Sequence, residues 1–263
     1  MNRLQLCDVI SVKQTPSATP SDCSFRQFVG EKSKPCSVFV PLHFEKNYSY
    51  PLIVWLHSDS DDQSQLKRVM PYISMRNFIG VAPCSTTPVA GPKGDANYVG
   101  CTWRQEKSSV FGAVEQIEYC IRRVQNRFKI HRERVFLAGY DAGATMALRI
   151  GLLFPELFAG VCALGGGLPQ TLTPFVNINQ FRGLPLFLSH GRDSEVHSPM
   201  NACRDIRLLH AAGMSLTVRQ YPCHQELTTQ MLGDVNAWMM EIVTGQHMRR
   251  DVVDSYLPAD GAN

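Results

Sequence analysis

The chain has 263 residues, a length that fits one large α/β domain with an ample buried core. Its 26 basic and 23 acidic residues leave a net charge of +3, which is too mild to indicate a nucleic-acid partner. Nine cysteines without a CxxC pair or Cys/His ligand spacing indicate reduced thiols in a cytoplasmic protein, and we predict neither a metal nor another cofactor. We also expect no membrane span and no signal peptide, because no apolar run is long enough.

Both ends of the chain are polar. Residues 1–34 contain a segment rich in Ser, Thr and Pro, and residues 246–263 have a similar character. Such composition is typical of segments that bury little apolar surface. We therefore predict a loosely ordered N-terminal extension over residues 1–34, a single domain over residues 35–245 and a flexible tail over residues 246–263.

Strand-like and helix-like segments alternate within the predicted domain. Residues 52–56 are a continuous apolar run, which is typical of a strand buried on both faces. Apolar residues at steps of three and four between residues 110 and 128 predict a long amphipathic helix. In chain order we predict a strand over 37–43, a strand over 52–56, a helix over 62–69 that ends near Pro71, a strand over 78–82, a long loop to about residue 107, a helix over 110–128, a strand over 134–138, a helix over 144–150, strands over 158–164 and 184–189, a helix over 199–210, a strand over 216–219 and a helix over 231–242.

This alternation predicts an α/β fold with a mainly parallel sheet and helices on both faces. In open sheets of this kind, ligands bind at the carboxyl ends of the strands. The segment Gly139-Tyr140-Asp141-Ala142-Gly143 stands at such a position, between an apolar strand and a helix. Its layout is that of a nucleophile elbow, in which a sharp turn lifts one side chain above the sheet. The elbow normally presents Ser, whereas this chain presents Asp141.

The chain resembles the α/β-hydrolase superfamily, and within it the phospholipase/carboxylesterase (dienelactone-hydrolase-like) group. Four segments carry the resemblance, and they keep the superfamily's order of nucleophile, acid and histidine. They are Tyr50–His57 before the oxyanion loop, Gly139–Gly143 at the elbow, Ser189–Val196 at the acid loop and Tyr221–Leu227 at the histidine loop. The resemblance implies a hydrolase without a cap domain that acts on a small-molecule substrate, of the esterase kind.

The resemblance also implies catalytic roles for Asp141, His224 and Asp193. Two positions stay open, because an ungapped match places Ser194 at the acid position and an alternative register places Gln225 at the histidine position. Each loop shifts by one residue between these alternatives.

The oxyanion donors follow from the same resemblance. The backbone N–H of Ala142 depends only on the elbow, so we expect it to be kept. The second donor belongs to a loop that begins His-Gly-x-Gly in the family and reads His57-Ser58-Asp59-Ser60 here. Without the two glycines, we expect the loop to aim its N–H less well. His57, Ser58, Tyr140 and Trp103 are further candidates for binding, although His57 and Trp103 are also typical of packing residues.

A carboxylate at the elbow leaves three functions open. One is an atypical hydrolase that uses Asp141 and His224. Another is a catalytically silent homologue that acts as a binding or scaffold protein, since fold does not guarantee chemistry. The third is a displacement at saturated carbon with Asp141 as nucleophile, as in the dehalogenase and epoxide-hydrolase branches of the superfamily. Attack of a carboxylate on an ordinary ester is disfavoured, because the tetrahedral species would expel the carboxylate rather than the more basic alkoxide.

Overall fold

The structure is a computed structural model, and it describes only part of the chain. The predicted tail over residues 246–263 and most of the predicted extension over residues 1–34 lie outside the described residues. Arg26–Phe28, inside that extension, is described and forms an edge strand paired with the first predicted strand. The described residues are 26–28, 35–90, 99–169 and 183–245.

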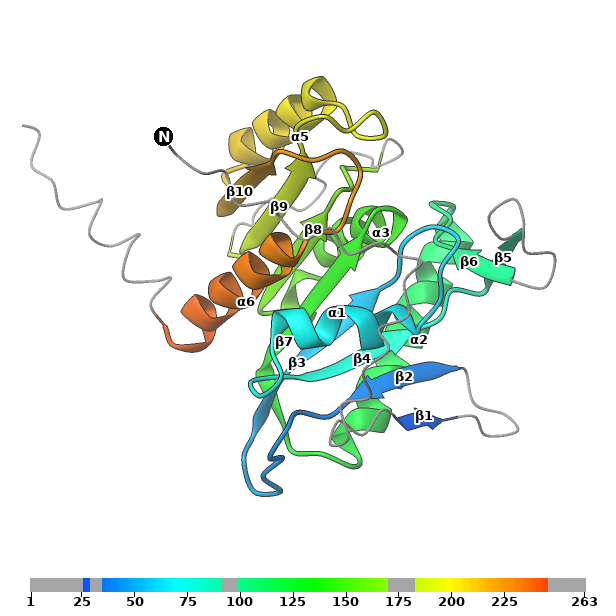
Figure 1. Cartoon of the computed structure of the whole chain (residues 1–263), viewed down its shortest axis with the longest axis vertical. Coiled ribbons are helices and arrows are strands. Elements are labelled where there is room, and N and C mark those ends of the chain that lie inside the picture. Colours follow the sequence, from blue (N-terminus) through cyan, green and yellow to red (C-terminus); the bar gives the residue numbers. More distant parts are fainter. Residues whose placement is uncertain (1–25, 29–34, 91–98, 170–182, 246–263) are drawn as a thin grey trace, which may run out of the picture.

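The described residues form an α/β fold, drawn in Figure 1. Each predicted strand and helix has a counterpart, with bounds that differ by a few residues. The strands are β1 (Arg26–Phe28), β2 (Cys36–Phe39), β3 (Tyr50–Leu56), β4 (Ile79–Pro83), β5 (Thr87–Ala90), β6 (Val99–Thr102), β7 (Ile130–Tyr140), β8 (Gly160–Leu164), β9 (Leu186–Gly191) and β10 (Leu216–Tyr221). The helices are α1 (Gln65–Ile73), α2 (Lys107–Gln125), α3 (Ala142–Leu153), the short 3-10 turn η1 (Pro155–Leu157), α5 (Pro199–Ala211) and α6 (Thr229–Val243).

Eight strands form one sheet in the order β1-β2-β4-β3-β7-β8-β9-β10. The six strands from β4 to β10 in this order run parallel, whereas β2 pairs antiparallel with β4 and β1 antiparallel with β2. The central strand β3 lies between β4 and β7, with Leu52 opposite both Ile79 and Val135. The predicted mainly parallel sheet is confirmed, and the apolar run of β3 is buried along its whole length.

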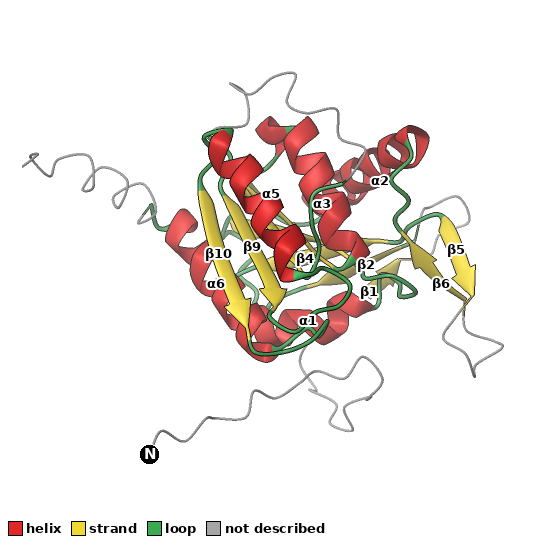
Figure 2. Ribbon diagram, turned by 90° about the horizontal axis from the view of Figure 1, so that it is seen from above, coloured by secondary structure: helices red, strands yellow, loops and turns green. Residues whose placement is uncertain are grey.

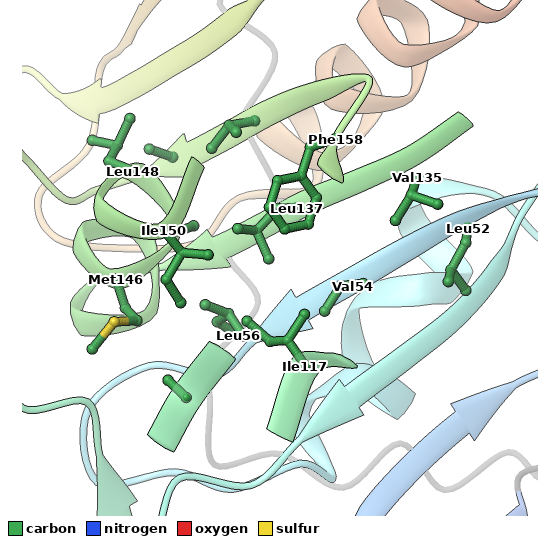
Figure 3. Close-up of a cluster of buried hydrophobic side chains, with 14 of the residues drawn as sticks. Leu52, Val54, Leu56, Ile117, Val135, Leu137, Met146, Leu148, Ile150 and Phe158 are labelled. Carbon is green, nitrogen blue, oxygen red and sulfur yellow. The ribbon is translucent and has the colours of Figure 1, made fainter. Parts of the chain in front are cut away.

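Helices cover both faces of this sheet, as Figure 2 shows, with α2, α3 and α5 on one face and α1 and α6 on the other. Alternate residues of each strand face opposite sides. In β3, Leu52, Val54 and Leu56 therefore pack towards α2 and α3, in the cluster of Figure 3, while Ile53 and Trp55 pack towards α1 and α6. Burying a side chain of this size contributes about 1.5–3 kcal/mol.

Two segments depart from the predictions. The loop predicted up to residue 107 contains an antiparallel ribbon, in which β5 pairs with β6 and with no other strand of the described residues. Pro88 lies in this ribbon, and an edge position tolerates the missing N–H of a proline. Helix α1 continues past Pro71 to Ile73, because Pro71 stands in the last turn and the buried Met70 and Ile73 hold that turn against the core.

The strands β3, β7, β9 and β10 all end at the same edge of the sheet, since they run parallel. Each is followed by a segment in which candidate residues were predicted. The fold therefore brings the loops after Leu56, Tyr140, Gly191 and Tyr221 to one edge, as expected for an open parallel sheet.

Candidate functional site

Asp141 occupies a sharp turn between β7 and α3. Its backbone has φ 55° and ψ −118°, a region that residues other than glycine rarely adopt. Its N–H donates to the Leu164 carbonyl over 2.9 Å, and its own carbonyl accepts the first bond of α3, from Ala144. A Cβ at Gly143 would lie 2.2 Å from the Leu56 carbonyl oxygen, so α3 can approach β3 this closely only with glycine there.

The carboxylate of Asp141 is half-buried and is held by three hydrogen-bond donors. Burial raises its pKa above the ordinary range, while bonds from the backbone N–H groups of Asp59 and Ala142 and from the side chain of Gln225 act in the opposite direction. The Asp59 N–H lies 3.2 Å from Oδ2 of Asp141. Thus the loop without glycines supplies one backbone donor to Asp141, and its aim at an oxyanion stays a prediction.

Gln65 of α1 holds that loop in place. Its Oε1 accepts from Trp55 Nε1 over 2.8 Å and from the Ser58 N–H over 3.2 Å. Its Nε2 donates to Ser58 Oγ over 2.9 Å and to the buried Asp61 carboxylate over 3.0 Å, and Asp61 also pairs with Arg68. Ser58 is a predicted binding residue, but its backbone N–H and its hydroxyl are both hydrogen-bonded to Gln65. The sequence pattern gave no signal for this network, because Gln65 lies on a helix outside the family's motifs.

A chain of hydrogen bonds leads from Ser194 through Gln225 to Asp141. The buried Ser194 donates from Oγ to Gln225 Oε1 over 2.7 Å. The Gln225 amide donates from Nε2 to the Gly165 carbonyl over 2.5 Å and also hydrogen-bonds the Asp141 carboxylate. Of the two registers left open by the sequence, the structure thus brings the Ser194 and Gln225 alternatives to Asp141.

Asp193 and His224, the other members of those pairs, lie on the exposed side of the same loops. Both oxygens of the Asp193 carboxylate accept from the Arg192 guanidinium over 3.1 Å, and this interaction lowers the pKa of Asp193. The imidazole of His224 is bonded through Nδ1 to the backbone carbonyl of Asp193 over 2.8 Å. Among the described residues, no imidazole hydrogen-bonds Asp141.

His57, Trp103 and Tyr140 are packed into the walls of the site. The Ser85 N–H donates to Nε2 of the buried His57 over 3.1 Å, so the ring proton is on Nδ1 and is donated to the Ser58 carbonyl. Burial lowers the pKa of His57, which favours this neutral ring. Trp103 Nε1 donates to the His57 carbonyl over 2.9 Å. Tyr140 is buried on the α1 and α6 face, and burial raises its pKa.

The described part of the chain shows no group of three or more His, Cys, Asp or Glu residues arranged to hold a metal ion. Within the same residues, no helix combines the length and the apolar character that crossing a membrane requires.

Residues 99–241, more than half of the chain, match the family model described as Phospholipase/Carboxylesterase. The chain belongs to this family. The match covers the turn at Asp141 and the loops after β9 and β10. No curated protein matches the chain by sequence.

Solved structures of other proteins have a similar fold. SOBER1 from Arabidopsis thaliana is 21% identical, with a TM-score of 0.61 over 74% of this chain and 100% of its own. A carboxylesterase from Mesorhizobium loti is 17% identical, with a TM-score of 0.64 over 81% of this chain and 98% of its own. The ferulic acid esterase AmCE1/Fae1A from Anaeromyces mucronatus is 14% identical, with a TM-score of 0.60 over 85% and 91%. At these identities the likeness concerns the fold.

Proposed function

We propose that this chain is a non-hydrolytic member of the phospholipase/carboxylesterase family, which uses the place of the active site to bind a small molecule. The observation that carries the proposal is the hydrogen-bonded chain Ser194–Gln225–Asp141. In this reading, Asp141 stands at the nucleophile position, Gln225 at the position of the general base and Ser194 at that of the acid.

None of these three side chains performs the task of the position it occupies. The amide of Gln225 cannot take a proton from a nucleophile, because it has no basic nitrogen. The Ser194 hydroxyl carries no charge with which to stabilise an imidazolium. A carboxylate at Asp141 is a poor nucleophile towards an alkyl ester, since it leaves more readily than the alkoxide. General acid–base catalysis, which contributes about 10²–10⁴-fold, therefore lacks a base.

The two backbone N–H groups that would stabilise an oxyanion already have a hydrogen-bond acceptor. The N–H of Asp59 and the N–H of Ala142 both hydrogen-bond the carboxylate of Asp141. Two such donors are what acyl-transfer enzymes aim at the developing oxyanion. An ester carbonyl could reach them only by displacing an anionic side chain that already satisfies them.

Asp141 suits ligand binding better than catalysis. A carboxylate has about four acceptor positions, and the Asp59, Ala142 and Gln225 donors account for three. We infer that the ligand offers an N–H or O–H to the remaining position. The carboxylate is half-buried, so a ligand can approach it from the open side.

The two hydrolytic alternatives need an imidazole beside Asp141. A hydrolase that uses Asp141 and His224 requires direct contact between them, and displacement at saturated carbon requires a base to hydrolyse the resulting ester of Asp141. His224 is exposed and bonded to the Asp193 carbonyl instead. The segment between β8 and β9 is also too short for the cap domain of the dehalogenase branch.

Rebuilding the missing groups tests the proposal. Wild-type protein should turn over p-nitrophenyl acetate no faster than a Gln225→Ala control. The triple variant Asp141→Ser/Gln225→His/Ser194→Asp should exceed both by about 10²-fold or more, because base, acid and nucleophile return together above intact backbone donors. Circular dichroism and thermal unfolding establish that each variant is folded.

Two outcomes of this experiment would overturn the proposal. Wild-type turnover that is lost in Asp141→Ala or in His224→Ala would mean that an atypical hydrolase is at work. A folded triple variant with no gain would mean that these residues do not stand at the catalytic positions.

A further inference from the structure

Two thiols lie side by side next to the loop that carries the Asp59 donor. Cys84 directly follows β4, and Cys101 lies on β6, with 3.6 Å between their sulfur atoms. The S–S bond of a disulfide is about 2.05 Å long. The two sulfurs are thus already neighbours, although Cys84 follows a strand of the main sheet and Cys101 belongs to the separate β5–β6 ribbon.

Both cysteines contact the segment that shapes the site. The Cys101 N–H donates to the Asp61 carbonyl over 2.8 Å, which makes an isolated bridge between β6 and the loop after β3. The Cys84 thiol is hydrogen-bonded by the backbone of Gln63. Next to Cys84, the Ser85 N–H donates to His57. A bond between the two sulfurs would thus tie together two segments that both contact residues 57–63, which include the Asp59 donor.

We propose that Cys84 and Cys101 are a redox-sensitive pair, whose reversible disulfide fixes the β5–β6 ribbon against β4 and immobilises the loop that holds Asp141. This disulfide would form whether or not the protein hydrolyses esters. Removing flexibility from a binding loop before the ligand arrives lowers the entropic cost of binding. Oxidation would in this way alter how the site binds.

The oxidant we infer is a low-molecular-weight disulfide such as oxidised glutathione. Cys101 is the partly exposed member, so its thiolate attacks one sulfur of the oxidant and expels a glutathione thiolate. Cys84 then loses its proton and attacks the Cys101 sulfur of the mixed disulfide, which expels the second glutathione. Two thiols are oxidised to one protein disulfide, and one glutathione disulfide is reduced to two thiols. Burial raises the pKa of Cys84 to about 12, which keeps it a thiol, so the partly exposed Cys101 reacts first.

Peptide mapping can isolate this pair from the other cysteines. Trypsin cuts the sequence into peptide 77–93, whose only cysteine is Cys84, and peptide 94–104, whose only cysteine is Cys101. After exposure of the folded protein to oxidised glutathione and alkylation of the remaining thiols, we expect these peptides linked to each other, and separated again by dithiothreitol. Alkylation of both peptides, or glutathione on Cys101 without the cross-link, would overturn the proposal.

Variants test the specificity and the consequence of the bond. Cys203→Ser removes an exposed thiol elsewhere and should leave the cross-link unchanged, while Cys101→Ser should abolish it. Hydrogen exchange of amides in residues 57–63 should slow at least several-fold on oxidation of the wild type, with no change in Cys101→Ser. Equal exchange in the reduced and oxidised wild type would contradict the proposed effect on the loop.

Discussion

The two sides of the candidate site differ in how much of an esterase's catalytic machinery they retain. On the β3–β7 side, the backbone N–H groups of Asp59 and Ala142 converge on one point, as they would in an esterase. On the β9–β10 side, Ser194 and Gln225 keep a hydrogen-bonded chain without a base or a charge. Backbone donors thus follow from the path of the chain, whereas the chemistry of the loops depends on single side chains that can change while the fold persists.

On the β3–β7 side, the largest loss of stability is expected for Gly143→Ala. A Cβ there would lie 2.2 Å from the Leu56 carbonyl oxygen and 2.4 Å from that of His57, so α3 and β3 would have to separate. We expect the free energy of unfolding, measured by urea denaturation, to fall by about 3 kcal/mol.

Gly112→Ala is the matched control for that substitution. No heavy atom lies within 4 Å of a Cβ at Gly112, which is inside helix α2. Alanine should there raise the free energy of unfolding by about 0.5–1 kcal/mol, because glycine weakens a helix interior. If Gly143→Ala were as stable as the wild type, the steric account of the turn would fail.

The next largest effect is expected at Gln65, which holds the loop that carries the Asp59 N–H. Gln65→Leu would remove the partner of Trp55 Nε1 and of Ser58, both of which are buried. We expect a loss of about 2–3 kcal/mol of unfolding free energy, because buried polar groups would lose their hydrogen bonds. Amide exchange at Asp59 should also become faster.

Gln116→Leu makes the same chemical change at a buried site on α2. Its Oε1 has no hydrogen-bond partner among the described residues, so leucine should be tolerated with little change in stability. Equal losses in the two variants would mean that the Gln65 bonds contribute nothing specific.

The parts of the structure that could be predicted from the sequence are those set by periodic burial and by glycine. The apolar run of β3 indicated a central strand, and Gly139 to Gly143 indicated the turn. The alternative at each loop, Asp193 or Ser194 and His224 or Gln225, could not be decided from the sequence. Neighbouring loop residues point in different directions, and a shift of one residue exchanges the exposed side chain with the buried one. The β5–β6 ribbon was missed because its strands are short and contain Pro88.

A smaller effect follows from the charge of Asp141. Burial raises its pKa in the folded state, so folding favours the protonated acid. The contribution of the Asp141 carboxyl to the free energy of unfolding is fully present below its pKa in the unfolded chain. This contribution is lost as the pH rises through its pKa in the folded protein. Asp141→Asn should therefore raise the melting temperature at neutral pH, and the gain should shrink as the pH falls into the acidic range. A gain that grew towards acidic pH would contradict the burial of the charge.

The smallest effect is expected for Asp193→Asn, on the exposed side of the loop after β9. The Arg192 guanidinium lowers the pKa of Asp193, so the sign is opposite to that of Asp141. Any stability from this group is present above the unfolded pKa and is lost as the pH falls through the folded pKa. Because both side chains are exposed, water and salt screen the pair, and we expect no measurable change in melting temperature at physiological ionic strength.

Ser194→Ala, one residue later, should lower the melting temperature, because it removes the bond to Gln225 from a buried site. If the two variants had the reverse order of effects, Asp193 rather than Ser194 would be the residue that supports the site.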